Sequence, residues 1–185
     1  MSNYQRHSAS SPAELIRDAQ RTPLRFIASL LESSGFLHGW DDEGALRAEF
    51  SSSDCDAIEM LIEWDDFSGM LNLSCFGGIT FSIEEKPGEI STFVNFLNNR
   101  TPMGSFCVME VNEDGKLQTL CARYSLAVPF ILRTEESVML LMKAFLEPFL
   151  PEVRQAFTAF SSFVHQDFSF EDAVMFGFAS ISGNA

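Results

Sequence analysis

The sequence has few basic residues. It contains 12 Lys and Arg against 26 Asp and Glu, which gives a formal net charge of −14. The imbalance is concentrated in residues 41–89, which hold thirteen acidic side chains against Arg47 and Lys86. A surface of this sign repels phosphate backbones and anionic lipids, so we expect neither nucleic acid nor membrane as a partner. It favours a basic polypeptide instead.

Long apolar runs are also missing. No stretch reaches the roughly 18 residues that a membrane-spanning helix needs, and the N-terminal MSNYQRHSASSPAEL has no apolar signal segment. The four cysteines are widely spaced and form no CxxC motif; they are Cys55, Cys75, Cys107 and Cys121. We interpret them as small buried hydrophobic residues rather than as a metal or disulfide site. These features predict a protein of the reducing cytoplasm.

Motifs of catalysis and cofactor binding are absent. There is no glycine-rich phosphate loop and no GxSxG elbow, and Gly77-Gly78 reads as a bend or bulge. The three His, at positions 7, 38 and 165, lack the close spacing of metal ligands. Carboxylate pairs at 41–42, 54/56, 65–66 and 84–85 flank predicted strands and read as solvated turns. We expect no enzyme, cofactor or metal; a Cys or Ser hydrolase assembled only in space is the least favoured alternative.

Phenylalanine is abundant, with 19 Phe against two Tyr and two Trp. Phe has no polar group, so these rings require burial in a core or against a partner. The stretch Glu89–Leu126 organises the chain. It predicts an amphipathic helix stopped by Thr101-Pro102, with Asn98-Asn99 as its left-handed cap, and then a hairpin closed at Glu113-Asp114-Gly115. Both faces of this hairpin are apolar, which predicts that both are covered.

The flanking segments predict the remaining elements. Residues 1–10 read as a flexible tail, and Ser11-Pro12-Ala13-Glu14 as a helix start. A second helical stripe runs from Leu24 to Gly35, and alternation over residues 46–83 predicts an antiparallel meander. Thr134 caps a later helix that Pro148 and Pro151 interrupt, and a further helix follows. We predict one α+β domain over residues 11–185, in the order helix–strand meander–helix–hairpin–helix.

A stripe of Phe lies in the last predicted helix. Phe157, Phe160 and Phe163 recur at helical spacing, which is typical of a face packed on a sheet. The alternative is a dimer seam or a groove for an apolar peptide. Phe168 and three later Phe bring the number of Phe side chains above what we expect one core to bury. This excess strengthens the case for a contact surface. The candidate partner-binding residues are therefore Phe157, Phe160, Phe163 and Phe168.

Several local strings resemble the YbjN-type domains, a group proposed to be bacterial sensory transduction regulators. The resemblance rests on Leu30-Leu31 through Gly35, the turn at 41–44, FVNFLNNR at Phe93–Arg100, and the stretch from Gly104 to Leu117. It covers about residues 24–165, and the Phe-rich tail departs from it. Such domains are similar in fold to the class I type III secretion chaperones. The resemblance implies a twisted antiparallel sheet with helices packed on it, homodimers, polypeptide binding and no catalytic residues.

Two hypotheses for function follow. The first is a non-catalytic, chaperone-like or regulatory protein that binds a polypeptide, as a homodimer. The second is a sensory module that binds a small ligand in a Phe/Met-lined pocket.

Overall fold

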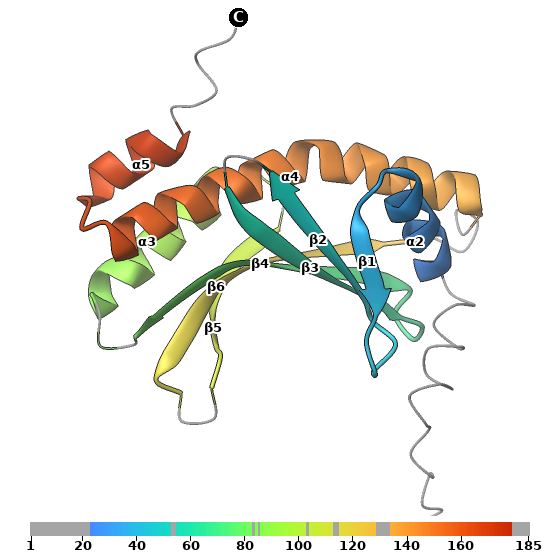
Figure 1. Cartoon of the computed structure of the whole chain (residues 1–185), viewed down its shortest axis with the longest axis horizontal. Helices are drawn as coiled ribbons and strands as arrows, with labels where there is room; N and C mark the ends of the chain where they lie inside the picture. Colours follow the sequence, from blue (N-terminus) through green and yellow to red (C-terminus); the bar gives the residue numbers. More distant parts are fainter. Residues whose placement is uncertain are drawn as a thin grey trace, which may run out of the picture.

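The computed structural model describes residues 23–52, 55–82, 84, 86–102, 104–112, 115–128 and 134–178. The predicted tail at 1–10 and helix start at 11–14 lie outside the described residues. Within these ranges, six strands form one antiparallel sheet (Figure 1). They are β1 (Leu37–Trp40), β2 (Leu46–Ser52), β3 (Cys55–Asp65), β4 (Met70–Ser82), β5 (Ser105–Glu110) and β6 (Leu117–Ala127).

The strand order is β1-β2-β3-β4-β6-β5. Strands β2, β3 and β4 form the meander predicted over residues 46–83, and β5 and β6 form the predicted hairpin. Strand β1, which pairs with β2, was not predicted from the sequence. Strand β6 joins the hairpin to β4, with Phe76 opposite Cys121, and β5 is left at the edge of the sheet. The α+β class predicted from the sequence is confirmed.

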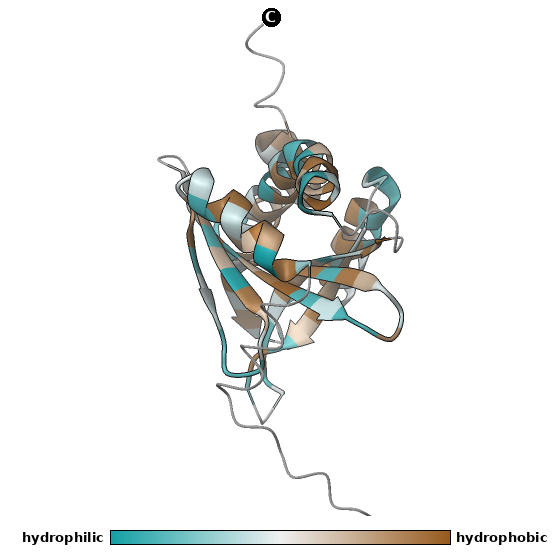
Figure 2. Ribbon diagram, turned by 90° about the vertical axis from the view of Figure 1, so that its right-hand side faces the viewer, coloured by the Kyte–Doolittle hydropathy of each residue, from teal (hydrophilic) through white to brown (hydrophobic). Residues whose placement is uncertain are grey.

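Alternation along the central strand decides which face of the sheet is buried. Leu71, Leu73 and Cys75 on β4 are fully buried, whereas the residues between them are partly exposed. Successive side chains of a strand point to opposite faces, so the buried set marks the side on which the helices lie. Figure 2 shows this mixture of hydrophobic and hydrophilic residues along the strands, with the long helix on one side only.

Gly77-Gly78 forms the predicted bulge. Strand β4 continues through it, with a register shift against β6 between Phe76 and Thr80. Gly78 has φ +68°, a conformation that residues with a side chain rarely adopt. A Cβ at Gly77 would lie 2.7 Å from the ring of Phe157, so the absence of a side chain lets that ring sit against the strand.

The helices are α2 (Leu24–Ser33), α3 (Pro87–Arg100), α4 (Glu135–His165) and α5 (Phe170–Phe178). Helix α4 crosses one face of the sheet, with α2 near one end of it and α3 near the other (Figure 1). Helix α5 packs on α4, so the C-terminal segment, whose state the sequence left open, is partly helical. Thr134 caps α4 as predicted, its hydroxyl accepting a hydrogen bond from the Ser137 N–H at 3.4 Å.

Helix α4 corrects one prediction. Pro148 and Pro151 were expected to interrupt it, yet both lie inside one helix of 31 residues. A proline inside a helix removes a hydrogen bond and costs about 3 kcal/mol. The neighbouring Phe145, Phe149 and Val153 are buried, and each such side chain contributes roughly 1.5–3 kcal/mol. Burial along the sheet therefore offsets the loss, a balance that local sequence signals do not show.

Phe rings form the centre of the core between α3, α4 and α5. Phe93 lies 5.6 Å from Phe160, 5.0 Å from Phe163 and 5.3 Å from Phe170 between ring centroids. Phe160 also meets Phe81 of β4 edge to face at 5.3 Å. These edge-on and tilted arrangements are the ones that aromatic quadrupoles favour. Many of the Phe side chains are thus buried within a single subunit.

Candidate functional site

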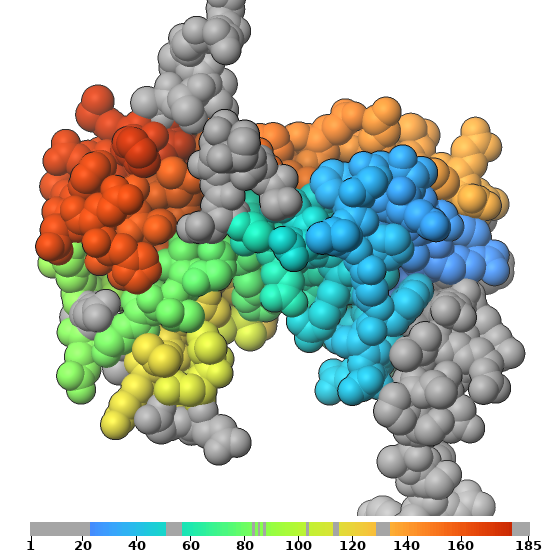
Figure 3. Space-filling model, viewed as in Figure 1, coloured from blue at the N-terminus to red at the C-terminus, as the bar shows by residue number. Residues whose placement is uncertain are grey.

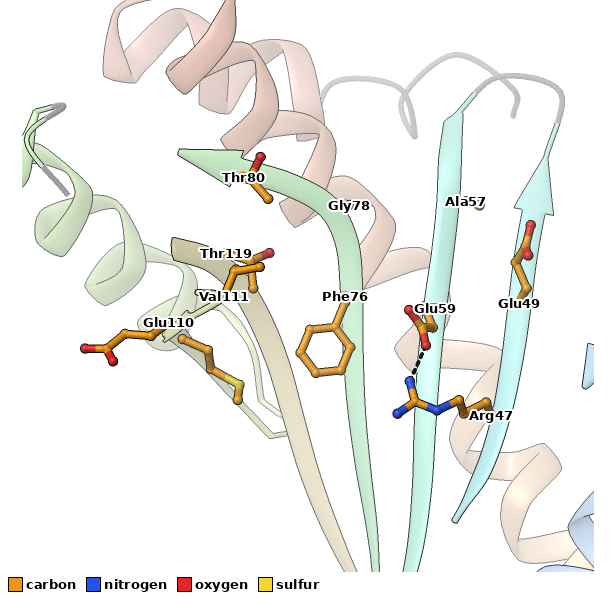
Figure 4. A pocket seen from close by; sticks show the side chains of 11 residues that line it. Arg47, Glu49, Ala57, Glu59, Phe76, Gly78, Thr80, Glu110, Val111 and Thr119 are labelled. Carbon is orange, nitrogen blue, oxygen red and sulfur yellow. Dashed lines mark hydrogen bonds and ion pairs between the residues drawn. The ribbon is translucent and has the colours of Figure 1, made fainter. Parts of the chain in front are cut away.

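The face of the sheet turned away from the described helices is hollowed into a groove. Its volume is about 550 Å³, and its walls come from five strands. Figure 3 shows the hollow between the end of the molecule formed by β5 and β6 and the end formed by β1 and β2. The lining residues are Arg47 and Glu49 of β2, Ala57 and Glu59 of β3, Phe76, Gly78 and Thr80 of β4, Met109, Glu110 and Val111 at β5, and Thr119 of β6 (Figure 4).

The apolar part of the groove is Phe76, Met109 and Val111. Phe76 stands on β4 two residues before Gly78, and Ala57 of the neighbouring strand β3 lies level with that glycine, so two small residues leave space beside the ring (Figure 4). A Cβ added at Gly78 would meet nothing within 4 Å, so that space is open. Val111, which follows β5, is 52% exposed. The groove therefore offers hydrophobic surface to solvent.

One ion-pair network crosses the opposite wall. The Arg47 guanidinium donates to Glu59 Oε1 at 2.5 Å (Figure 4). It also donates to Asp41 Oδ2 at 3.2 Å. The hydrogen bond to Glu59, with the charges of both carboxylates, raises the pKa of Arg47 despite its partial burial. Arg47 is thus engaged by acids of its own chain. Glu49 adds further negative charge to this wall, so the wall formed by β2 and β3 is acidic, whereas the Glu110 carboxylate turns away from Phe76 (Figure 4).

The aromatic residues predicted to bind a partner lie elsewhere. Phe157, Phe160 and Phe163 are only 4%, 0% and 1% exposed, because they pack between α4 and the sheet. This corrects their selection as a contact surface: in this fold they form core, the other interpretation left open from the sequence. Phe168 is half-buried and meets Phe176 edge to face at 5.7 Å. Phe176 is 55% exposed, so the outer side of α5 presents aromatic surface to solvent.

The groove residues themselves carried one signal in the sequence. In the hairpin, Cys107, Met109 and Val111 share one apolar face, and Phe106 and Val108 share the opposite face. Both faces were predicted to be covered by other elements. The described helices cover only the Phe106 face, on which Phe106 is 3% exposed. The uncovered face became part of the groove. Phe76 had no signal beyond its alternation with Cys75.

The described cysteines occupy both faces of the sheet. Cys75 is buried beneath the helices, and burial raises its pKa. Cys121 is buried and pairs with the half-buried Cys107 across β5 and β6. Burial raises the pKa of Cys121 to about 11, so its thiol is protonated at neutral pH. The charge of Arg123 acts on Cys121 in the opposite direction, but burial outweighs it.

The carboxylate pairs within the described residues act in turns. Asp41 Oδ1 accepts hydrogen bonds from the N–H groups of Glu43 and Ala45. Asp65 Oδ1 accepts from those of Phe67 and Ser68. Within the described ranges, no group of three or more His, Cys, Asp or Glu lies close enough together to hold a metal ion. No helix in the same ranges has both the length and the apolar character needed to cross a bilayer.

A smaller pocket of about 370 Å³ lies where α3 meets the end of α4. It is lined by Lys86, Ile90, Val164, His165 and Asp167. The Lys86 amine donates to the Phe163 carbonyl at 3.1 Å and lies 4.8 Å from the centre of that ring. A Lys that bonds the last carbonyls of a helix stabilises its C-terminus. Lys86 therefore ties α3 to α4.

Comparison with known proteins bears on the fold. No protein-family model matches the chain, and no curated protein matches its sequence. A solved structure does match: YbjN from E. coli, described as a candidate transcription regulator, superposes with a TM-score of 0.50 at 13% sequence identity. The match covers 77% of this chain and 93% of the YbjN chain. The chain has a YbjN-like fold. This confirms the resemblance drawn from short sequence strings, and at this identity it concerns the fold alone.

Proposed function

We propose that this protein is a non-catalytic, chaperone-like regulator that binds a polypeptide in the groove of its open sheet face. The observation that carries the proposal is that one hollow combines at least partly exposed apolar side chains, Phe76, Met109 and Val111, with the acidic side chains of Glu49 and Glu59. Binding sites are typically concave and combine apolar side chains with a few polar ones, as this groove does.

The chemistry of the lining favours a basic, extended segment with apolar side chains. An apolar residue would fill the space beside Phe76, and a Lys or Arg residue next to it would meet Glu49. The net charge of −14 would attract such a segment at long range and speed its association. Arg47 leaves this preference intact, because Glu59 and Asp41 already neutralise it.

The similarity to YbjN supports a regulatory role within this proposal. YbjN is described as a candidate transcription regulator, and the two chains share a fold. A regulator that acts by holding another polypeptide needs no catalytic residues. We further predict that the protein has no enzymatic activity, forms a homodimer and is located in the cytoplasm. Light scattering during size exclusion tests for the homodimer.

Peptide binding tests the proposal directly. Fluorescence anisotropy would compare a labelled peptide of alternating Lys and Leu with a peptide in which Glu replaces Lys. We expect the full-length protein to bind the basic peptide preferentially. Phe76→Ser should weaken binding by roughly tenfold or more, as loss of an aromatic anchor does. The matched control is Leu140→Ser, at a residue of α4 that is 68% exposed and outside the groove.

Two outcomes would contradict the proposal. One is equal binding of basic and acidic peptides, or none of either. The other is an equal effect of Phe76→Ser and Leu140→Ser on affinity.

The second hypothesis, a sensory module for a small ligand, is favoured by the size of the groove. Its volume of about 550 Å³ lies within the range of roughly 300–1,000 Å³ typical of ligand sites, and Phe and Met both line it. A thermal-shift screen against metabolites separates the two functions. A metabolite that raises the Tm of the native protein but not of Phe76→Ser would favour the sensory module.

A further inference from the structure

Two cysteines face each other at the edge of the sheet. Cys107 of β5 and Cys121 of β6 are direct partners in the antiparallel register. Both side chains point to the open face, because the neighbouring Phe106 is buried on the helix side. Cys75, the other described cysteine on the adjacent strand β4, pairs with Ala122 and lies on the opposite face.

The hydrogen bonds of the hairpin define the spacing of this pair. The N–H and carbonyl of Phe106 are bound by Asn98 of α3, so they point away from β6. Bonding alternates along an antiparallel ladder, so Cys107 and Cys121 form a hydrogen-bonded pair, with a Cα separation of about 5.5 Å. Disulfides span Cα separations of about 4.4–6.8 Å, most often about 5.5–6 Å. The backbone already meets the requirement for a bridge.

The side chains are close as well. The Cys121 thiol donates to the Ala122 carbonyl at 3.7 Å, and the neighbouring Cys107 thiol adds to the effect of burial in raising the pKa of Cys121. Directly opposed Cβ atoms lie roughly 4.5–5.5 Å apart, whereas a disulfide needs about 3.8 Å, so closure requires a shift of about 1 Å. Among the described strands β5 pairs with β6 alone, and Asn98 holds β5 at Phe106, so the shift falls on Cys107 and the residues after it.

We propose that Cys107 and Cys121 are a site of reversible oxidation, forming an intramolecular disulfide across β5 and β6 in the presence of a peroxide. The half-buried Cys107 is the thiol that peroxide reaches, since Cys121 is fully buried. The Cys107 sulfur attacks one peroxide oxygen and becomes a sulfenic acid, releasing one water. The Cys121 sulfur then displaces the hydroxyl as a second water, so two thiol hydrogens are lost and one peroxide is reduced.

Arg123 assists this second step. It lies two residues from Cys121 on the same face of β6, and its guanidinium donates to Met109 Sδ at 3.2 Å. Its charge lowers the pKa of Cys121, in opposition to burial. The bridge would stiffen the strands that carry Met109 and Val111, which line the groove. The oxidation itself does not depend on what the groove binds.

Mass spectrometry of the full-length protein tests the proposal. The reduced protein is treated with hydrogen peroxide, blocked with iodoacetamide under denaturing conditions and digested. We expect a loss of about 2 Da from the intact mass, two blocked thiols in place of four, and a linked peptide pair containing Cys107 and Cys121. Millimolar glutathione should restore both thiols, because a bridge that needs a shift of the strands is readily reduced.

Single variants identify the order of the steps. Cys121→Ser should leave a sulfenic acid on Cys107 that dimedone traps, and Cys107→Ser should slow oxidation of Cys121 severalfold. The matched control, Cys75→Ala, should leave the linked peptide unchanged. The proposal is overturned if the link joins other cysteines, if only dimers between chains form, or if both thiols stay free in peroxide. A link that glutathione cannot reduce would refute its reversibility.

Discussion

Asn98 of α3 holds both backbone groups of Phe106 on the edge strand β5. Its Oδ1 accepts from the Phe106 N–H at 2.6 Å, and its Nδ2 donates to the Phe106 carbonyl at 3.0 Å. An edge strand presents free backbone groups to which another chain can pair. One amide side chain closes this position and joins α3 to the hairpin.

Asn98→Ala should therefore lower stability. Two hydrogen bonds are lost, each with a net contribution of about 0.5–1.5 kcal/mol, so we expect the free energy of unfolding to fall by about 1–3 kcal/mol. Urea denaturation measures it. Asn99→Ala, at the exposed neighbour, is the control and should change stability far less. Equal losses in the two variants would contradict the role given to Asn98.

The burial of the Phe stripe predicts a large contrast between two Phe positions. Phe160 is 0% exposed, and Phe160→Ala should cost about 3–5 kcal/mol through lost burial and a cavity. Phe67 projects from the β3–β4 turn and is fully exposed, so Phe67→Ala should stay within about 0.5 kcal/mol of the native protein. Thermal and urea unfolding measure both. A small effect at Phe160 would argue that this stripe is a surface after all.

Docking of α5 depends on a glycine. A Cβ at Gly177 would lie 2.7 Å from Ala159 Cα, closer than any side chain can pack, so Gly177→Ala should push α5 away from α4. Hydrogen exchange would report this as faster exchange of the α5 amides, with the sheet unchanged. The control is Gly88→Ala in α3, where an added Cβ meets nothing within 4 Å. Unchanged protection of α5 in Gly177→Ala would contradict the packing.

The β3–β4 turn should give a pH signature. The pKa of Asp65 is lowered from its ordinary value of 3.8, first by the Ser68 hydroxyl and then by the N–H groups of Ser68 and Phe67. Because the folded pKa is depressed, the contribution of Asp65 to stability is complete above the ordinary value. It is lost as the pH falls through the lowered folded value.

An NMR titration of the Asp65 carboxyl measures this effect. We expect a midpoint below 3.8 in the native protein and a higher midpoint in Ser68→Ala. Ser105→Ala, on the distant strand β5, should leave the midpoint in place. A shift in both variants, or in neither, would reject the hydrogen bonds as the cause.

The sequence predicted most of the local structure. Alternation marked strands β2 to β4, Thr101-Pro102 stopped α3, and Thr134 capped α4, because each signal is read within a few residues. It erred where distant packing competes with a local signal. Pro148 and Pro151 did not end α4, and Asn98 did not cap α3 but turned its side chain to Phe106.

By itself, the sequence determined that this protein is acidic, rich in Phe and built of strands and helices in a stated order. Only the tertiary structure decided which apolar faces are covered. Periodicity shows that Phe157 and Phe160 share a face, and that Met109 and Val111 share another. It does not show which of these faces meets a neighbouring element. That depends on how α4 lies across the sheet, which buries the Phe stripe and leaves the groove of Phe76, Met109 and Val111 open.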